Sequence, residues 1–321
     1  MKKMHLLAIM ACLFWACQDQ NPPETPQTPT PEPEPQESKM TDYFINPVAW
    51  NGAFVEVSAA FIGLSPDTQW PTVLTVNYGD SAIGADGLEH SGSLRINATN
   101  RFETAGAVIT PDFTDFRVYG SSMSGRQTIT NTGLNTAGHL VYAVTVEDGR
   151  LDGGQEFIYS ESTQRELIAG LGEDGLLLPD LNAHQYSITG QMRMQSRVDT
   201  IPGYEVTVDS LPMNISMGEL YPTAGQMHIE LDRPIEYEMN LENLQGKVSI
   251  QTIDLRFTGK TASGNYGAEL TISIQMGFIT VPFTIQCELN ESGLINSQIS
   301  TKTSVHLHIS KIITTFAADF M

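Results

Sequence analysis

The chain has 321 residues, of which 37 are acidic and 17 are Lys or Arg, so its formal net charge is −20. Binding to phosphates depends on clustered Lys and Arg, so this composition excludes nucleic acid and anionic lipid headgroups as expected partners. Three cysteines exclude a disulfide-rich fold, and the length is sufficient for one large hydrophobic core or two ordinary ones.

Residues 1–16 have the layout of a secretory signal peptide. Lys2 and Lys3 are followed by Leu6–Ala16, an apolar run of eleven residues, which is shorter than the about 20 residues that a membrane-spanning helix needs. Two cysteines near this run each follow an alanine, and the stretch resembles a bacterial lipoprotein signal, in which a lipidated cysteine becomes the new N-terminus. Cleavage before Cys12 would leave an apolar core of only six residues, so we assign the lipid to Cys17. The alternative is an ordinary cleaved signal with incidental cysteines.

Residues 17–39 are expected to form an extended tether between lipid and folded body. Residues 18–39 hold seven of the 17 prolines and no large apolar side chain, so they cannot bury enough surface to offset chain entropy. Proline at this density favours polyproline II at about 3.1 Å per residue, which gives a semi-rigid spacer of up to roughly 70 Å. The N-terminal region therefore predicts an exported lipoprotein of the outer membrane, on its periplasmic or surface side.

The rest of the sequence predicts an all-β fold. From Trp70 onward, short alternating runs rich in Val, Ile, Thr, Tyr and Phe are separated by Gly, Asn and Asp. Residues 53–64 are the segment expected to be helical. The strand pattern predicts an antiparallel β-sandwich or open barrel-like sheets. A turn-rich interruption at 172–184 suggests two stacked β halves, 40–180 and 181–321, with a sheet continuous across it as the alternative.

Two hairpins are expected from the phase of the apolar residues. In AELTISIQMGFITVPFTIQCEL the apolar positions change from even to odd at Gly277, which is the signal of a type II′ turn. Folding there places Cys287 opposite Ala268 on the buried face. In HLVYAVTVEDGRLDGG the alternation meets Asp148-Gly149, the pair preferred in a type I′ turn.

A third hairpin carries the candidate metal ligands. In GQMHIELDRPIEYEMNLEN, a loop at 232–234 would set Glu230 opposite Glu236, and His228 opposite Glu238, on one face. Like charges opposite each other are destabilising, so this face binds a cation or is simply solvated. Oxygen ligands would favour Ca²⁺, but two strands rarely supply the roughly 6–8 oxygens that Ca²⁺ takes. The solvated face is the preferred interpretation, and Ca²⁺ is the alternative.

Five segments between Pro71 and about Gly172 carry a family resemblance: PTVLTVNYG, GADGLEHSGSLRI, GAVIT, FRVYGSSMSGRQTITNTG and SESTQRELIAGLG. In these turn glycines and strand patterns the chain resembles a family of uncharacterised exported lipoproteins of the Bacteroidetes type. The resemblance covers about a third of the chain. It implies a cell-envelope lipoprotein and lends no catalytic residues.

The remaining motifs assign no reaction. The segment GLGEDG fits G-x-G-x-x-G, but Glu173 and Asp174 would repel a pyrophosphate. His306 and His308 share one strand face, but a metal site needs further ligands.

The sequence as a whole predicts a cell-envelope lipoprotein with a non-catalytic β-rich binding or structural surface. We expect a glycan or another envelope protein as its partner, membrane attachment through the lipid, and no cofactor. One alternative is a surface hydrolase with paired carboxylates, which a cleft with two facing acids would favour. The other is a carrier of an apolar ligand, which an apolar cavity would favour, whereas a flat or grooved face with exposed aromatics would favour binding.

Overall fold

The computed structural model describes most of the chain between residues 49 and 299. The described ranges are 49–65, 67–118, 120–151, 157–196, 202–217, 219, 221–241, 244–276, 279–290 and 293–299. The expected signal peptide, Cys17, the tether, Gly277 and the two C-terminal histidines lie outside these ranges. No helix in the described ranges is both long and apolar enough to cross a membrane.

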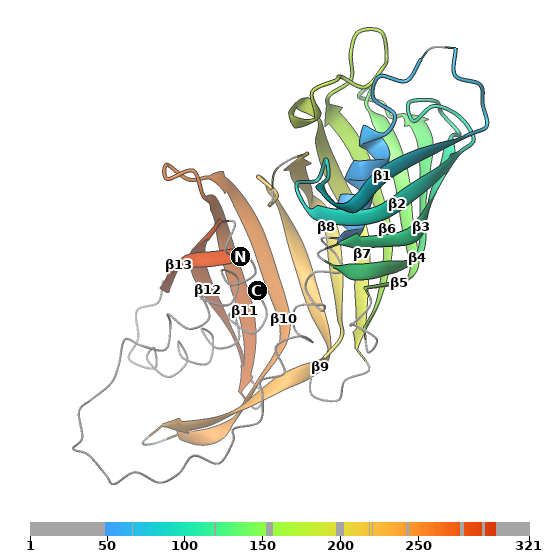
Figure 1. Cartoon of the computed structure of the whole chain (residues 1–321). Helices are drawn as coiled ribbons and strands as arrows, with labels where there is room; N and C mark the ends of the chain where they lie inside the picture. Colours follow the sequence, from blue (N-terminus) through green and yellow to red (C-terminus); the bar gives the residue numbers. More distant parts are fainter. Residues whose placement is uncertain are drawn as a thin grey trace.

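Thirteen strands form one antiparallel sheet in the described part of the chain (Figure 1). They are β1 (Thr72–Ile83), β2 (Glu89–Ala98), β3 (Val108–Val118), β4 (Ser121–Leu134), β5 (Leu140–Leu151), β6 (Phe157–Ala169), β7 (Gln185–Ser196), β8 (Tyr204–Ser216), β9 (Gly225–Leu241), β10 (Leu244–Lys260), β11 (Tyr266–Met276), β12 (Ile279–Asn290) and β13 (Gly293–Ile299), with a 3-10 turn η1 (Leu181–Ala183) before β7. Their order in the sheet is their order in the sequence. The all-β prediction is confirmed, and the sheet is open and strongly curved.

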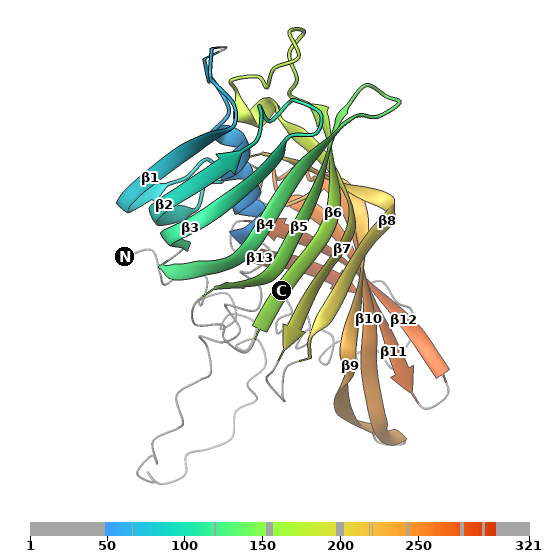
Figure 2. The same cartoon turned by 90° about the vertical axis from the view of Figure 1, so that its right-hand side faces the viewer.

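The turn-rich interruption at 172–184 does not break the sheet. It connects β6 to β7, and these strands pair from Phe157 and Ser196 at one end to Ala169 and Gln185 at the other. At the junction between β8 and β9 the described ladder consists of four residue pairs. On one side of this junction β1–β8 curve around a helix, and on the other side β9–β13 continue the sheet (Figures 1 and 2).

A helix at 49–59 fills the inside of the curve formed by β1–β8, which confirms the first part of the helical prediction; residues 60–63 form a turn. Most of its side chains are buried, and these include the polar residues Glu56 and Ser58, as expected of a helix enclosed in a core. Trp50 contacts the edge of Phe113 at a centroid distance of 5.3 Å, and Phe54 contacts Tyr186 at 5.2 Å. The main core therefore lies between this helix and the concave face of the sheet.

The hairpin formed by β11 and β12 has the register expected from the sequence. Met276 pairs with Ile279 at the turn, and Ala268 pairs with Cys287 at the other end. Ile272, Ile274 and Cys287 are buried, as the alternation requires.

Cys287 provides a test of this register. Its Sγ donates to the Ala268 carbonyl oxygen at 3.4 Å, and burial raises the pKa of the thiol to about 11. The thiolate is the reactive form, so we expect a thiol reagent to label Cys287 only after denaturation. Peptide mass spectrometry after labelling in buffer and in denaturant measures this, and rapid labelling of the native protein would contradict the register.

The two other predicted hairpin turns are wrong. At Asp148 and Gly149, β5 continues through a bulge in which Asp148 has φ of 51°. Gly149 is needed there because a Cβ would lie 2.7 Å from Trp50 Nε1. At 232–234, β9 also continues, and residues 231–234 lie opposite the single residue Gln251 of β10. Proline lacks a backbone N–H, so it fits the unpaired part of such a bulge as well as a turn.

Candidate functional site

Two clusters of buried charged and polar side chains in the described core contact the helix. Burying a charge is costly unless it is paired, and perturbed buried groups are where functional sites are most often found. We call these the Glu56 cluster (Glu56, Tyr78, Asp86 and His90) and the Glu161 cluster (Asn51, Tyr159, Glu161, Thr163 and Arg165).

The Glu56 cluster joins the helix to β1, β2 and the turn between them. Tyr78 on β1 donates its hydroxyl to Glu56 Oε2, and the backbone N–H of Asp86 donates to Glu56 Oε1 at 2.9 Å. His90 on β2 places Nε2 2.8 Å from Asp86 Oδ1 and 3.8 Å from Glu56 Oε1. The His90 ring also stacks on Phe116 at 5.0 Å, which fixes its orientation. These contacts lock one end of the helix onto the sheet.

Burial dominates the electrostatics of this cluster. It raises the pKa of Glu56, the hydrogen bonds from Tyr78 and from the Asp86 N–H lower it, the charge of Asp86 raises it, and His90 lowers it. Burial also raises the pKa of Tyr78 well above its ordinary value, and the hydrogen bond to Glu56 adds to this shift. Asp86 Oδ2 and His90 Nδ1 have no hydrogen-bond partner among the described residues. The cluster thus holds two close carboxylates with unused coordinating capacity.

The Glu161 cluster centres on an ion pair along β6. Arg165 Nη2 donates to Glu161 Oε1 at 2.9 Å, and both side chains are at most 4% exposed. Thr163 and Tyr159 donate to the two oxygens of the same carboxylate at 2.5 and 3.1 Å. Arg165 Nη1 donates to Asn51 of the helix at 2.8 Å. Both Glu161 oxygens are satisfied, so this cluster is a structural clamp.

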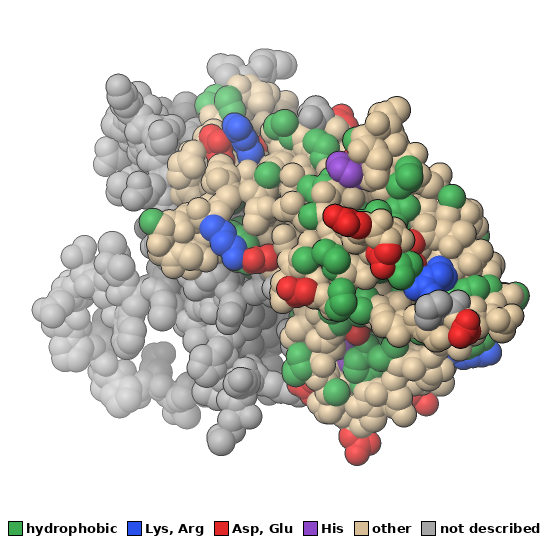
Figure 3. Space-filling model, turned by 90° about the horizontal axis from the view of Figure 1, so that it is seen from above, with side chains coloured by type: hydrophobic (Ala, Val, Ile, Leu, Met, Phe, Trp, Pro, Cys, Tyr) green, Lys and Arg blue, Asp and Glu red, His purple; other side chains and the backbone are tan. Residues whose placement is uncertain are grey.

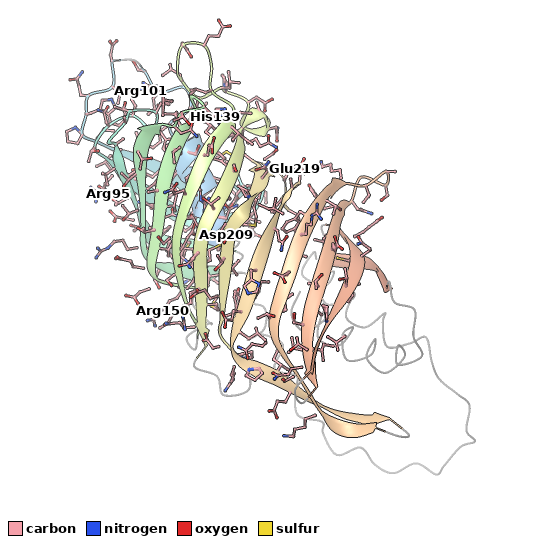
Figure 4. All side chains as sticks on the ribbon, turned by 180° about the vertical axis from the view of Figure 1, so that it is seen from behind. Arg95, Arg101, His139, Arg150, Asp209 and Glu219 are labelled. Carbon is pink, nitrogen blue, oxygen red and sulfur yellow. The ribbon has the colours of Figure 1, made fainter. Side chains whose placement is uncertain are left out.

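A cavity of about 60 Å³ lies between the two clusters. Its wall is formed by the helix, the turn before β2, and the inner faces of β6–β8, through Asn51, Gly52, Phe54, Val55, Asp86, Leu88, Arg165, Tyr186, Ile188, Ile215, Ser216, Met217 and Glu219. Figure 4 places Glu219 just beyond the end of β8, next to β10. There Glu219 accepts from Lys260 Nζ at 2.6 Å and from the Tyr266 hydroxyl. The cavity therefore lies beside the junction between the two parts of the sheet.

The structure does not assemble the Ca²⁺ site considered for His228, Glu230, Glu236 and Glu238. Because the predicted hairpin is wrong, all four residues lie along the single strand β9. Glu230 pairs with Thr252 of β10, and Glu236 pairs with Ser249 of β10. They therefore do not face each other across a ladder.

The described side chains of this group have other partners. Glu236 accepts from Lys247 Nζ at 2.9 Å, and His228 Nδ1 lies 2.8 Å from Asp254 Oδ1. Both pairs are largely solvent-exposed, where ion pairs contribute little to stability.

The like-charge pair in this region is Glu205 on β8 opposite Glu230 on β9. Arg193 of β7 compensates for it, with Nη1 3.3 Å from Glu205 and Nη2 3.1 Å from Asp232. This arginine bridges β8 and β9 on the outer face of the sheet.

Sequence analysis assigned no role to either buried cluster. One available signal was Glu56, an acid inside an otherwise apolar helical segment. A second was the alternation of Glu161, Thr163 and Arg165, but Ser160 and Ser162 make the opposite face of β6 equally polar. The sequence therefore did not show which face of β6 was buried.

A third His–carboxylate pair joins the residue before β5 to β6 and gives a pH-dependent prediction. His139 Nδ1 lies 2.6 Å from Glu166 Oε1, and hydrogen bonds from His139 and Asn135 lower the pKa of Glu166. This interaction stabilises the fold above the unfolded pKa of glutamate, near 4.3, and its contribution is lost as the pH falls through the lower folded pKa. Both side chains are about one-third exposed, so Glu166→Gln is expected to cost roughly 0.5 kcal/mol at pH 7. Urea unfolding at pH 7 and below pH 4 measures this; a cost that persists in acid would contradict the assignment.

Comparisons of the chain with protein-family models, with curated proteins and with solved structures found no match. The family resemblance between residues 71 and 172 stays a prediction from the sequence. The proposed function therefore rests on the sequence and on the geometry of the molecule itself.

Proposed function

We propose that this chain is an exported, lipid-anchored protein of the cell envelope whose β body is a non-catalytic binding module for an uncharged glycan. The proposed anchor is the lipid on Cys17, followed by the proline-rich tether, as the sequence predicts. The binding surface that we propose is the outer face of β4–β8, which Figure 2 shows as one broad curved surface.

The observation that carries this proposal is a set of uncharged polar side chains in register across five strands. Side chains that alternate with buried ones along a strand lie on the outer face. The pairing of neighbouring strands joins these outward positions into two rows that run across the sheet. One row crosses five strands and consists of Thr128, Thr145, Ser162, Gln191 and Thr207. The next crosses four strands and consists of Thr130, Ala143, Gln164 and Thr189, of which Ala143 is the apolar member. The chain as a whole is strongly acidic, yet these rows contain no charged residue.

The chemistry of these rows matches an uncharged polysaccharide. Hydroxyl and amide groups both donate and accept hydrogen bonds, as sugar hydroxyls do. Adjacent strands are about 4.8 Å apart, so the rows present a regular array of donors and acceptors. The acidic charge elsewhere on the chain would repel a polyanion. An uncharged glycan is therefore the partner of best chemical complementarity.

Aromatic stacking does not contribute to this proposed recognition. The exposed large apolar residues of the described part are aliphatic: Val73, Ile83, Leu134, Leu178 and Leu211. On the face seen from above, hydrophobic, acidic and basic side chains are interspersed (Figure 3). Binding on the outer face of β4–β8 would depend on hydrogen bonds and on shape.

The geometry gives less support to the two alternatives. For a hydrolase, the adjacent acids Glu56 and Asp86 are buried, and both Glu56 oxygens accept hydrogen bonds within the cluster, so they do not face a sugar-sized cleft. For an apolar carrier, the inside of the β1–β8 curve is occupied by Trp50, Phe54 and Phe61, each at most 1% exposed. An apolar ligand would have to displace the helix.

The binding proposal is tested by retention of the protein on uncharged and on anionic insoluble polysaccharides. We expect retention on an uncharged polymer, and at least tenfold weaker binding in Ser162→Glu/Gln164→Glu. The control is Thr75→Glu, an exposed position of β1 outside the surface, which should bind like wild type. Failure to bind any uncharged polymer, or equal binding by both variants, would refute the glycan surface.

The anchoring proposal has a separate test. Wild-type protein is expected in the membrane fraction with an acylated N-terminal Cys17, as shown by mass spectrometry. Cys17→Ala should prevent acylation and membrane attachment, whereas Cys12→Ala should leave both unchanged. A Cys17→Ala protein that is still membrane-bound would contradict the proposal.

A further inference from the structure

Three potential metal ligands of the Glu56 cluster lie close together. One ligand atom from each of Glu56, Asp86 and His90 lies within 4.8 Å of the other two. They come from the helix, from the turn after β1, and from β2, so the fold brings together residues that are far apart in the sequence. We propose that they form a Zn²⁺ site whose fourth ligand is a water from the adjacent cavity.

Two of the three separations between the ligand atoms, those from His90, can be compared with a tetrahedral ion. Zinc lies about 2.0–2.1 Å from nitrogen and oxygen ligands, so two ligand atoms at tetrahedral positions are about 3.3 Å apart. His90 Nε2 is 2.8 Å from Asp86 Oδ1 and 3.8 Å from Glu56 Oε1. The two distances lie on either side of the tetrahedral value, and shifts of about half an ångström would bring both to it.

Outer contacts already orient the ligands. The Tyr78 hydroxyl donates to Glu56 Oε2, and the Asp86 N–H donates at 2.9 Å to Oε1, which lies 3.8 Å from His90 Nε2. The Leu88 N–H donates to Asp86 Oδ1 at 2.9 Å and holds that side chain in place. Such outer hydrogen bonds are a regular feature of metal sites because they fix the geometry of the ligands.

An unpartnered carboxylate oxygen is the second observation that points to an ion. The Asp86 side chain is 4% exposed, and its Oδ2 has no hydrogen-bond partner among the described residues. Asp86 also lines the cavity, which is large enough for a water ligand. A buried oxygen without a partner is energetically costly, and coordination of an ion by this carboxylate, with a water in the cavity beside it, would remove that cost.

Two glycines keep the surroundings of the ligands open. A Cβ at Gly84 would overlap Glu56 Oε1 and lie 2.8 Å from His90 Nε2, and a Cβ at Gly52 would overlap Asp86 Oδ2. At both positions a side chain would occupy the space next to the ligand atoms.

The donor set selects the metal. One imidazole nitrogen with two carboxylates suits Zn²⁺, whereas Ca²⁺ takes about 6–8 oxygens and Mg²⁺ keeps several waters in an octahedron. The divalent charge would also compensate two carboxylates buried side by side. The site lies inside the curve of the sheet, so this inference is independent of the glycan surface proposed on the outer face.

The competing explanation is a metal-free hydrogen-bond network that only fixes the helix to β1 and β2. The two explanations differ in whether the chain binds one ion at His90. We would measure Zn²⁺ binding to the full-length, chelator-treated protein by calorimetry, and metal content by elemental analysis. The variants are His90→Gln and Asp86→Asn, which preserve size and hydrogen bonding. The matched control is His139→Gln, which removes the partly exposed His139–Glu166 pair.

We expect wild type and His139→Gln to bind one Zn²⁺ that His90→Gln and Asp86→Asn do not, with affinity at this site weakened about 100-fold or more. Zn²⁺ should also raise the unfolding midpoint of wild type and of His139→Gln, and leave those of His90→Gln and Asp86→Asn unchanged. No stoichiometric binding by wild type, or equal binding by wild type and His90→Gln, would overturn the proposal. Should a variant fail to fold, the visible spectrum of Co²⁺-loaded wild type decides: tetrahedral bands without a thiolate charge-transfer band support the site, and their absence refutes it.

Discussion

Replacing Arg165 with methionine is expected to lower the free energy of unfolding by about 3–5 kcal/mol, the usual cost of leaving one member of a buried ion pair unpaired. Arg165 and Glu161 are both nearly inaccessible to solvent. The variant would leave the Glu161 carboxylate buried with only the hydroxyls of Thr163 and Tyr159 as donors. It would also remove the guanidinium that lies 4.2 Å from the centroid of the Phe54 ring. Equilibrium unfolding in urea at neutral pH measures the loss.

Two controls separate burial from charge in this experiment. Arg126 pairs with Glu147 at 3.5 Å, but its side chain is 73% exposed, so Arg126→Met should cost less than about 1 kcal/mol. The double variant Glu161→Leu/Arg165→Met removes both charges and should recover much of the stability lost in Arg165→Met. Equal costs for Arg165→Met and Arg126→Met would show that the buried pair does not hold the helix in place.

Phe54→Ala is expected to cost about 3–5 kcal/mol, as is typical when a large aromatic side chain is removed from a core. Phe54 is 1% exposed and contacts Phe102, Tyr142 and Tyr186 at centroid distances of 6.1, 6.3 and 5.2 Å. No other side chain can easily fill the space, because the helix is enclosed by the sheet. The free energy of unfolding from denaturant titration is the appropriate measurement.

The control for this variant is Leu134→Ala, at a position that is 64% exposed. That substitution should change stability by no more than about 0.5 kcal/mol. If Phe54→Ala were as mild as Leu134→Ala, the helix at 49–59 would not be part of the core, and the proposed zinc site on its surface would lose its support.

The sequence predicted strand pairing well where one face of a hairpin is apolar. Between Ala268 and Cys287 the apolar positions change phase once, and only one register buries all of them, so the observed ladder matches the expected one. The predictions failed at Asp148-Gly149 and at residues 232–234. Turn-forming residues also suit bulges, and local sequence does not distinguish a strand that turns back from one that continues past an unpaired residue.

The two buried clusters could not have been located from the sequence. Glu56 reaches His90 only because the helix packs inside the curve of the sheet, and such contacts between distant segments leave no periodic signal. Arg165 and Glu161 are two positions of a strand whose faces are both polar, so a hydrophobic pattern does not identify the inner one. Tertiary packing decides both cases.

The order of the strands has a consequence for how the chain folds. Every described strand pairs with its predecessor and its successor in the sequence, so most strand contacts join residues separated by short loops. Low contact order of this kind favours fast folding for a β protein, because little loop-closure entropy is lost before a ladder forms. A chain that emerges N-terminus first can add one strand at a time to a growing sheet. The helix at 49–59 precedes all the described strands in the sequence, so its residues emerge before those of β1–β8, which close around it.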